Sequence, residues 1–186
     1  SGENIWAGQF PFERAQRAGC FRDLSLRIIL SLVDSVERTE LSRYDGSPHA
    51  TAYQLYLAGQ NELRLLDLRN IRRGRRWFRA ALNECQDFVP ALTGLARSFE
   101  VEWVLMAGGD TELLDEATQL ALRAIEIDPD DARGYRELGV SSLYAKRYDD
   151  SVEALDRGEQ RNPQHADQIA DYADALTHTS DFPGAL

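Results

Sequence analysis

Apolar residues recur at spacings of three and four along most of the chain, which is the period of an amphipathic helix. After residue 10 no segment alternates with the period of two that marks a strand. The pattern predicts a long helix over 20–44, followed by shorter helices separated by turns that contain glycine or proline. The shorter helices are expected near 49–66, 70–86, 90–106, 112–127, 131–144, 148–160 and 164–178, with one more starting at Pro183.

The same turn returns at a fixed interval. Pro129 and Pro163 lie 34 residues apart, and each separates two predicted helices. A 34-residue period with two short amphipathic helices in each unit resembles the tetratricopeptide repeat (TPR). The residues of unit 131–164 that carry the resemblance are Tyr135, Leu138, Gly139, Ser151, Leu155, Gly158 and Pro163, with Ser142 in place of a usual tyrosine.

The other units follow the repeat less closely. Unit 88–130 is about nine residues longer than the motif between Phe99 and Ala117, and the extra residues are expected at the end of its first helix and in the loop GGDTE. Unit 49–87 has Gln86 where the closing proline should stand, and unit 165–186 is cut off at Leu186. The resemblance implies an all-α fold, a right-handed superhelix of about three and a half hairpins. The cut repeat is expected to expose apolar surface that needs a cap, a partner or further chain.

A second resemblance covers the beginning of the chain. The order of SGENIWAGQF, a long amphipathic helix, ATAYQLYLAGQ and an arginine-rich helix ending in WFRAAL looks like a bacterial regulator architecture. In that architecture a TolB-like α/β domain leads into TPRs, after a class III adenylate cyclase or winged-helix domain. The resemblance implies that residues 1–19 are the extended end of a preceding α/β domain and that 20–48 form a long connecting helix.

Charge is unevenly distributed between the two halves of the chain. Residues 1–99 hold 14 arginines and 11 acids, whereas residues 100–186 hold 7 basic residues and 20 acids. The acidic second half disfavours contact with nucleic acid or with an anionic membrane, and no apolar run approaches the ~20 residues that span a bilayer. Arginine is the basic residue everywhere except at Lys146, which favours a bacterial, GC-rich genome. Cys20 and Cys85 show no disulfide or metal spacing, so a cytoplasmic location is expected.

Candidate catalytic and metal-binding residues are scarce. None of His49, His165 and His178 has metal-ligand spacing on a helix face, apart from His165 with nearby Asp167. No nucleophile motif or phosphate-binding glycine loop is present. The sequence therefore predicts no catalytic residue, no metal and no cofactor, and a protein that is not an enzyme.

Arginines gather on one face of the helix over 70–86. Arg69, Arg72, Arg73 and Arg76 follow helical spacing. One interpretation is a solvated face that pairs with acids of a neighbouring helix. A second is a docking surface for an acidic partner, and a third, less favoured because no base-reading pattern accompanies it, is nucleic-acid binding.

The first helices of successive TPR hairpins line the concave face of the superhelix. By helical phase, the residues expected there are Thr93, Arg97, Arg133, Arg136, Glu137, Val140, Asp167, Asp171 and Asp174. They are the candidate partner-binding residues. The alternative is that Arg133 and Arg136 simply pair with Asp167 and Asp171 of the next helix. The lysine and asparagine clamp of family members that bind chaperone tails is missing, so no binding of a C-terminal carboxylate is expected.

These observations favour a non-catalytic interaction and regulatory module of a larger bacterial signalling or transcriptional protein, with a protein or peptide partner. Two alternatives stay open: the C-terminal part of an adenylate cyclase, and a self-associating scaffold that forms a homodimer. The sequence also leaves open whether the chain's own amino-terminal helix occupies the concave face.

Overall fold

The computed structural model describes residues 48–163 and 166–179. All seven helices of this part lie within two to three residues of the bounds expected from the sequence, and none of its residues forms a strand. The helices are α2 (Pro48–Leu63), α3 (Leu68–Glu84), α4 (Val89–Leu105), α5 (Glu112–Ile127), α6 (Ala132–Tyr144), α7 (Tyr148–Arg161) and α8 (Ala166–His178). The extended segment expected over 1–19, the long helix over 20–44 and the helix starting at Pro183 lie outside the described residues.

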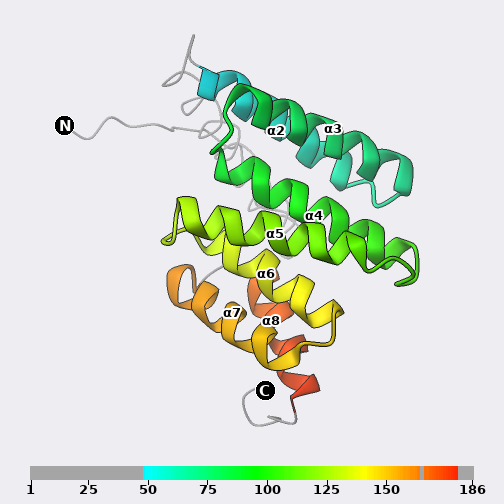
Figure 1. The fold of residues 1–186 in the computed structure, drawn as a ribbon, viewed down its shortest axis with the longest axis vertical. Coiled ribbons are helices and arrows are strands. Elements are labelled where there is room, and N and C mark those ends of the chain that lie inside the picture. Colours follow the sequence, from blue (N-terminus) through cyan, green and yellow to red (C-terminus); the bar gives the residue numbers. More distant parts are fainter. Residues whose placement is uncertain (1–47, 164–165, 180–186) are drawn as a thin grey trace, which may run out of the picture. The chain divides into compact units, whose positions relative to one another are not determined.

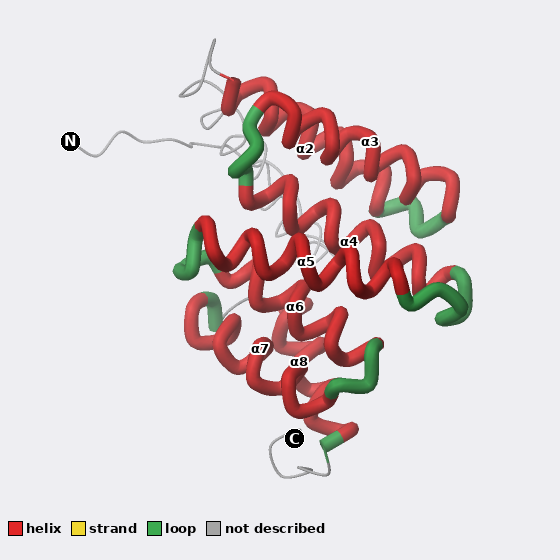
Figure 2. Tube along the Cα trace, viewed as in Figure 1, coloured by secondary structure: helices red, strands yellow, loops and turns green. Residues whose placement is uncertain are grey.

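The chain divides into two compact units, residues 1–50 and 51–186, and the second contains the hairpins described below. From α3 to α8 each helix packs against the next, and α2 packs on α3 through Tyr56, whose ring centroid lies 6.0 Å from that of Phe78. The helices follow one another in sequence order along the stack, joined by short loops (Figures 1 and 2). In addition α4 contacts α6, and α6 contacts α8. The first helices of successive hairpins therefore lie side by side.

Small residues allow the helices of the third hairpin to approach closely, as the repeat predicts. A methyl group built on Gly139 of α6 would lie 2.4 Å from the side chain of Leu155 on α7, which is fully buried. Ser151 donates a hydrogen bond of 2.8 Å from its hydroxyl to the carbonyl oxygen of Gly139. A side chain larger than hydrogen at position 139 would therefore push α6 and α7 apart.

The divergent first hairpin uses the same packing with a larger residue. Phe78 of α3 has no exposed surface, and its ring fills the space between Gly59 of α2 and Gly94 of α4. A Cβ atom on Gly59 or Gly94 would lie 2.5 or 2.6 Å from this ring. Phe78 thus connects the first hairpin to the second, although the sequence of this unit departs from the motif.

The extra length of the second hairpin lies where the sequence predicts it. Helix α4 continues to Leu105, and Gly108, with φ of +76°, ends it by donating its N–H to the carbonyl of Trp103 at 2.9 Å. Asp110 then accepts the backbone N–H of Glu112 at 3.0 Å and starts α5. The lengthened α4 carries Val104 and Leu105 beyond the end of a standard repeat helix, beside the candidate site.

Candidate functional site

The candidate residues of the concave face lie on three helices that are in contact. Helix α4 carries Thr93 and Arg97, and α6 carries Arg133, Arg136, Glu137 and Val140. Helix α8 carries Asp167, Asp171 and Asp174, and the side chain of Asp167 lies outside the described part. The contacts of α4 with α6 and of α6 with α8 place them on neighbouring elements (Figure 1).

Arg136 is at the centre of the group. Its side chain is only 9% exposed, and its Nη1 donates to Glu137 Oε1 at 2.8 Å. Its Nη2 lies 2.7 Å from Asp171 Oδ2, so the pairing with the next helix that the sequence suggested as an alternative is present. Burial alone would lower the pKa of Arg136, but the carboxylates of Glu137, Asp171 and Glu100 outweigh it and raise this pKa. Arg136 thus ties α6 to α8 as a permanently charged residue.

Three of the expected residues do not join this group. Thr93 is buried, and its hydroxyl donates to carbonyl groups of its own helix, those of Val89 and Pro90, at 3.2 Å each. Arg133 pairs with Asp131, the residue that caps the start of α6. Asp174 is exposed, and its carboxylate lies 3.9 Å from Nε2 of His178 one turn later.

The structure adds a residue that the helical phase did not bring forward. Glu100 of α4 is 2% exposed and lies against Glu137, with which its carboxyl makes a side-chain hydrogen bond. Burial, and then the charge of Glu137, raise the pKa of Glu100 well above its usual range. The sequence does hold a signal, because Glu100 and Glu102 are acids inside the otherwise apolar stretch FEVEWVL.

A pocket of about 310 Å³ opens beside this cluster of charges. Its polar lining consists of Arg97, Glu100, Arg136 and Asp171, so the charged cluster forms part of its wall. The apolar lining comes from Leu66, Val101, Val104, Leu105, Val140 and Tyr144. Among these apolar residues Leu66, Val104 and Leu105 are 63%, 48% and 40% exposed. The pocket therefore combines solvent-accessible apolar side chains with buried charges.

The arginine face of α3 lies at the contact with α4. Arg72 donates from Nε and Nη2 to Oε1 of Glu102 at 2.9 and 2.7 Å, and Arg75 donates from Nη2 to Oε2 of the same carboxylate at 2.6 Å. Arg73 pairs with Glu62 of α2 at 3.3 Å. Arg69 and Arg76 are exposed. Two of the four candidate arginines of this face therefore take part in ion pairs with neighbouring helices.

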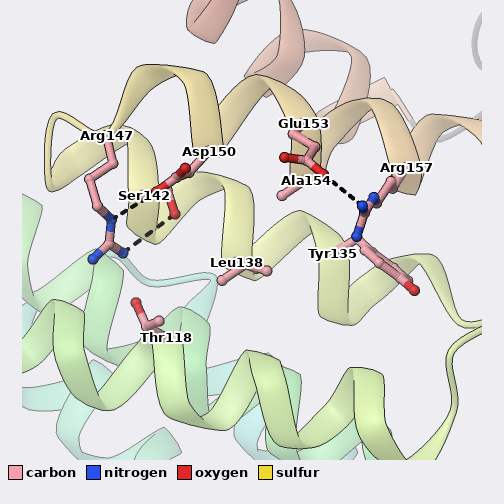
Figure 3. Close-up of a pocket in the computed structure, with 9 residues that line it drawn as sticks. All are labelled: Thr118, Tyr135, Leu138, Ser142, Arg147, Asp150, Glu153, Ala154 and Arg157. Atoms are coloured by element: carbon pink, nitrogen blue, oxygen red, sulfur yellow. Dashed lines mark hydrogen bonds and ion pairs between the residues drawn. The ribbon is translucent and has the colours of Figure 1, made fainter.

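A second pocket, of about 320 Å³, lies among α5, α6 and α7 (Figure 3). Its floor includes Leu138 and the hydroxyl groups of Thr118 and Ser142. Its charged side chains pair with each other: Arg157 with Glu153 at 2.6 Å, and Arg147 with Asp150 at 3.8 Å. All four are exposed, and these pairs satisfy one another within α7 and its amino-terminal turn. This pocket offers no buried group without a partner among its lining residues.

Possible metal ligands of the described part do not gather in one place. Across residues 48–163 and 166–179, no cluster of three or more His, Cys, Asp or Glu side chains could hold a metal ion. His178 instead stacks on Tyr148, with ring centroids 5.0 Å apart. Within the same part of the chain, no helix has the length and apolar character needed to cross a membrane.

Known proteins resemble this chain in structure only. No protein-family model matches the sequence, and no curated protein matches it either. The thermophilic TPR protein TTC0263 of Thermus thermophilus superimposes with a TM-score of 0.64 and 12% identity, covering 87% of this chain and 81% of that one. The first TPR domain of the human RPAP3 protein gives 0.59 and 9%, covering 75% and 100%. MamA 41-end from Desulfovibrio magneticus RS-1 gives 0.53 and 15%, covering 93% and 91%.

The likeness confirms the fold expected from the repeat. The chain has the all-α, hairpin-repeat fold of TPR domains. At these identities the likeness shows the fold and nothing further. It gives no support to the expected resemblance to TolB-like regulators or adenylate cyclases, which stays a prediction.

Proposed function

We propose that the hairpins form a non-catalytic protein–protein interaction module that binds a segment of a protein partner on the face formed by α4, α6 and α8. The observation that supports this proposal is the pocket beside Arg136, because it joins exposed apolar side chains to buried charged ones. Apolar surface supplies affinity, and fixed charges select the partner. The second pocket lacks this combination, since its charges are exposed and paired.

The lengthened α4 strengthens the case for this face. Val104 and Leu105 stand in the last turn of α4, and both are exposed, whereas Val101 one turn earlier is half-buried and Glu100 and Glu102 are buried. Exposed apolar residues that adjoin a pocket are typical of interaction surfaces. An apolar side chain of a partner would cover them and reach the charged cluster at the same time.

Peptide selection with the full chain tests this function. Random peptides displayed on phage are selected on the wild-type chain, and the enriched peptides are synthesised and titrated against two variants. Val104→Lys places a positive charge in the pocket, whereas Leu122→Lys makes the same change on α5, where Leu122 is 45% exposed. We expect Val104→Lys to weaken binding by about tenfold or more and Leu122→Lys to leave it unchanged. Failure to enrich any peptide, or equal binding by both variants, would contradict the function.

The module is also proposed to act within a larger bacterial signalling or transcriptional regulatory protein. The support for this context is the sequence resemblance of the first part of the chain, in which an adenylate cyclase or winged-helix effector precedes the repeats. Intact mass and peptide mapping of the protein from its own cells test it. A chain with such an effector segment before Ser1 supports this context, and a chain that begins near Ser1 contradicts it.

Self-association is the alternative that one observation favours. Ile169 lies on α8, the last described helix of the stack, and is 45% exposed. An apolar residue in this position could pair two copies of the chain. Light scattering over a range of concentrations measures this, and a dimer that dissociates in Ile169→Glu would support it.

A further inference from the structure

We propose that the pocket between α4, α6 and α8 receives an arginine side chain of the partner, whose guanidinium group is bound by the carboxylate of Glu100, the member of the Glu100–Glu137 pair that lines the pocket. The inference rests on the proposed function and names the chemistry that this face selects. It is carried by the balance of charges around Glu100, by the buried oxygen atom of Glu100 and by a similar contact elsewhere in the molecule.

Acids outnumber bases in the buried cluster that borders the pocket, when Glu137, which does not itself line the pocket, is included. Three carboxyl groups, those of Glu100, Glu137 and Asp171, surround the buried Arg136. Among the described residues, the other guanidinium that acts on Glu100 is that of Arg97, on the same helix. With all three acids ionised, the cluster therefore has one negative charge in excess. One positive charge from a ligand would neutralise it.

Polar atoms in this cluster lack partners. Glu100 Oε1 and Glu137 Oε2 are buried, and within the described part of the chain no N–H group donates to either, so these two oxygens have no partner other than the opposite carboxyl group. The two residues are 2% and 4% exposed, and Arg136 Nε is buried without an acceptor. A buried acceptor without a donor costs free energy, and a charged acceptor costs more. A guanidinium group brings five N–H donors in one plane and can satisfy the oxygen of Glu100, which lines the pocket.

The same helix shows how this protein satisfies a buried carboxylate. Glu102, two residues after Glu100, is bound by the guanidinium groups of Arg72 and Arg75 of α3 at 2.6 to 2.9 Å. Glu100 lies on α4 beside α6, where Arg136 donates to Glu137 and Asp171 instead. The chain thus provides arginines for Glu102, whereas for Glu100 the geometry leaves room for one from outside.

The pocket also fits the aliphatic part of an arginine. Val101, Val104 and Val140 line it, and the methylene groups of an arginine pack well on such side chains while the guanidinium reaches a polar group. An anionic ligand is less suited, because both terminal nitrogens of Arg136 are engaged with carboxylates and only its buried Nε lacks an acceptor. The preference for a basic over an acidic ligand agrees with the sequence, which lacks the lysine and asparagine clamp by which some TPR proteins bind a C-terminal carboxylate.

Ionisation of Glu100 links this binding to pH. The groups that face Glu100 are Arg97 on its own helix and Arg136, Glu137 and Tyr144 on α6, and Asp171 of α8 completes the cluster. Burial and Glu137 raise the pKa of Glu100, which favours the protonated carboxyl in the empty pocket. A guanidinium group favours the ionised form, so binding lowers this pKa and promotes loss of the proton. Affinity is therefore expected to rise with pH.

A pair of peptides tests the proposal. The probes are Ac-Leu-Val-Arg-Leu-Tyr-amide and the same peptide with citrulline, which has the shape of arginine without its charge. Each is titrated into the full chain, with binding followed by the NMR signals of the Val104 methyl groups and by calorimetry. We expect the arginine peptide to bind about tenfold or more tightly than the citrulline peptide and to gain affinity from about pH 5 to about pH 8.

Variants of the chain complete the test. Glu100→Gln is expected to remove the preference for arginine, whereas Glu116→Gln, which changes an exposed acid on α5, should leave it intact. Glu137→Gln serves as the second variant if Glu100→Gln fails to fold. Equal affinity for the two peptides with Val104→Lys still weakening both would overturn the arginine site while the proposed function stands. No binding of either probe up to about 5 mM would also overturn it.

Discussion

Glu100 and Glu102 lie two residues apart on α4 and are almost equally buried, with exposed fractions of 2% and 4%. Their pKa values nevertheless shift in opposite directions. The hydrogen bonds and charges of Arg72 and Arg75 outweigh burial and lower the pKa of Glu102. Burial and the neighbouring carboxylate raise the pKa of Glu100. At Glu102 the arginines of α3 reverse the effect of burial, whereas at Glu100 burial and a neighbouring acid act in the same direction.

The face of α4 toward α3 and the face toward α6 differ in the same way. Toward α3, Glu102 joins the first hairpin to the second through contacts that are complete within the chain. Toward α6, Glu100 faces a second acid next to an accessible pocket. Buried polar groups that find all their hydrogen-bond partners within the chain contribute stability, whereas buried polar groups without such partners are suited to binding a ligand. Variants at each residue can separate these contributions.

The largest effect is expected from Glu102→Gln. The amide removes the negative charge that holds Arg72 and Arg75, and breaking a buried ion pair costs about 3 kcal/mol. The free energy of unfolding, measured by urea denaturation at pH 7, should fall by this amount. The low pKa of Glu102 stabilises the folded state above the unfolded pKa, and this stabilisation is lost as the pH falls through the folded pKa. The deficit of the variant should therefore shrink in acid, and a deficit that does not change with pH would contradict this account.

A smaller effect is expected from Arg75→Ala. Arg75 donates to Glu102 at 2.6 Å and to the hydroxyl and carbonyl oxygens of Ser98 at 3.2 and 3.1 Å, and its guanidinium lies 3.9 Å from the centre of the Phe99 ring. Losing these contacts should lower the free energy of unfolding by about 2 kcal/mol in the same denaturation experiment. Arg72→Ala is the matched control.

Arg72 and Arg75 bind the same carboxylate but differ in how far their side chains are exposed. The side chain of Arg72 is 57% exposed, against 11% for Arg75, and both bind the Glu102 carboxylate. Water replaces the contacts of an exposed arginine at little cost. Arg72→Ala should therefore destabilise the chain less than Arg75→Ala. Equal losses would mean that the charge of Glu102, and not the buried packing of Arg75, accounts for the contact.

The sequence predicted most of the fold because its turns are marked by residues with strong conformational preferences. Pro90, Gly108 and Asp131 stand at helix ends in the structure as the sequence indicated, and the small residue at Gly139 packs against the large Leu155. Helix bounds and hairpin order follow from such local rules. The divergent first hairpin was harder to align with the motif, because Gln86 stands where the closing proline should be. Its Phe78 nevertheless packs between Gly59 and Gly94 of different hairpins.

The candidate site was predicted less well, because side-chain partners depend on contacts between helices. Helical phase placed Arg136 and Asp171 on neighbouring faces, and they do form an ion pair. The same phase treated Thr93 as a surface residue, whereas it is buried and bonded within α4. Glu100 was missed since no local pattern says which acid of FEVEWVL meets an arginine and which meets another acid.

The smallest expected effect, and the one of opposite sign, belongs to Glu100→Gln. Because the folded pKa of Glu100 is raised, its proton stabilises the folded state below the unfolded pKa, and this stabilisation is lost as the pH rises toward the folded pKa. Glutamine carries no charge, so the variant should be more stable than wild type by about 1 kcal/mol at pH 7 and equal to it near pH 4. Urea denaturation over this pH range, with Glu116→Gln as the exposed control, measures the difference. A loss of stability at pH 7 would mean that the ionised Glu100 is satisfied within the chain, as Glu102 is, and that no charge from a partner is needed in the pocket.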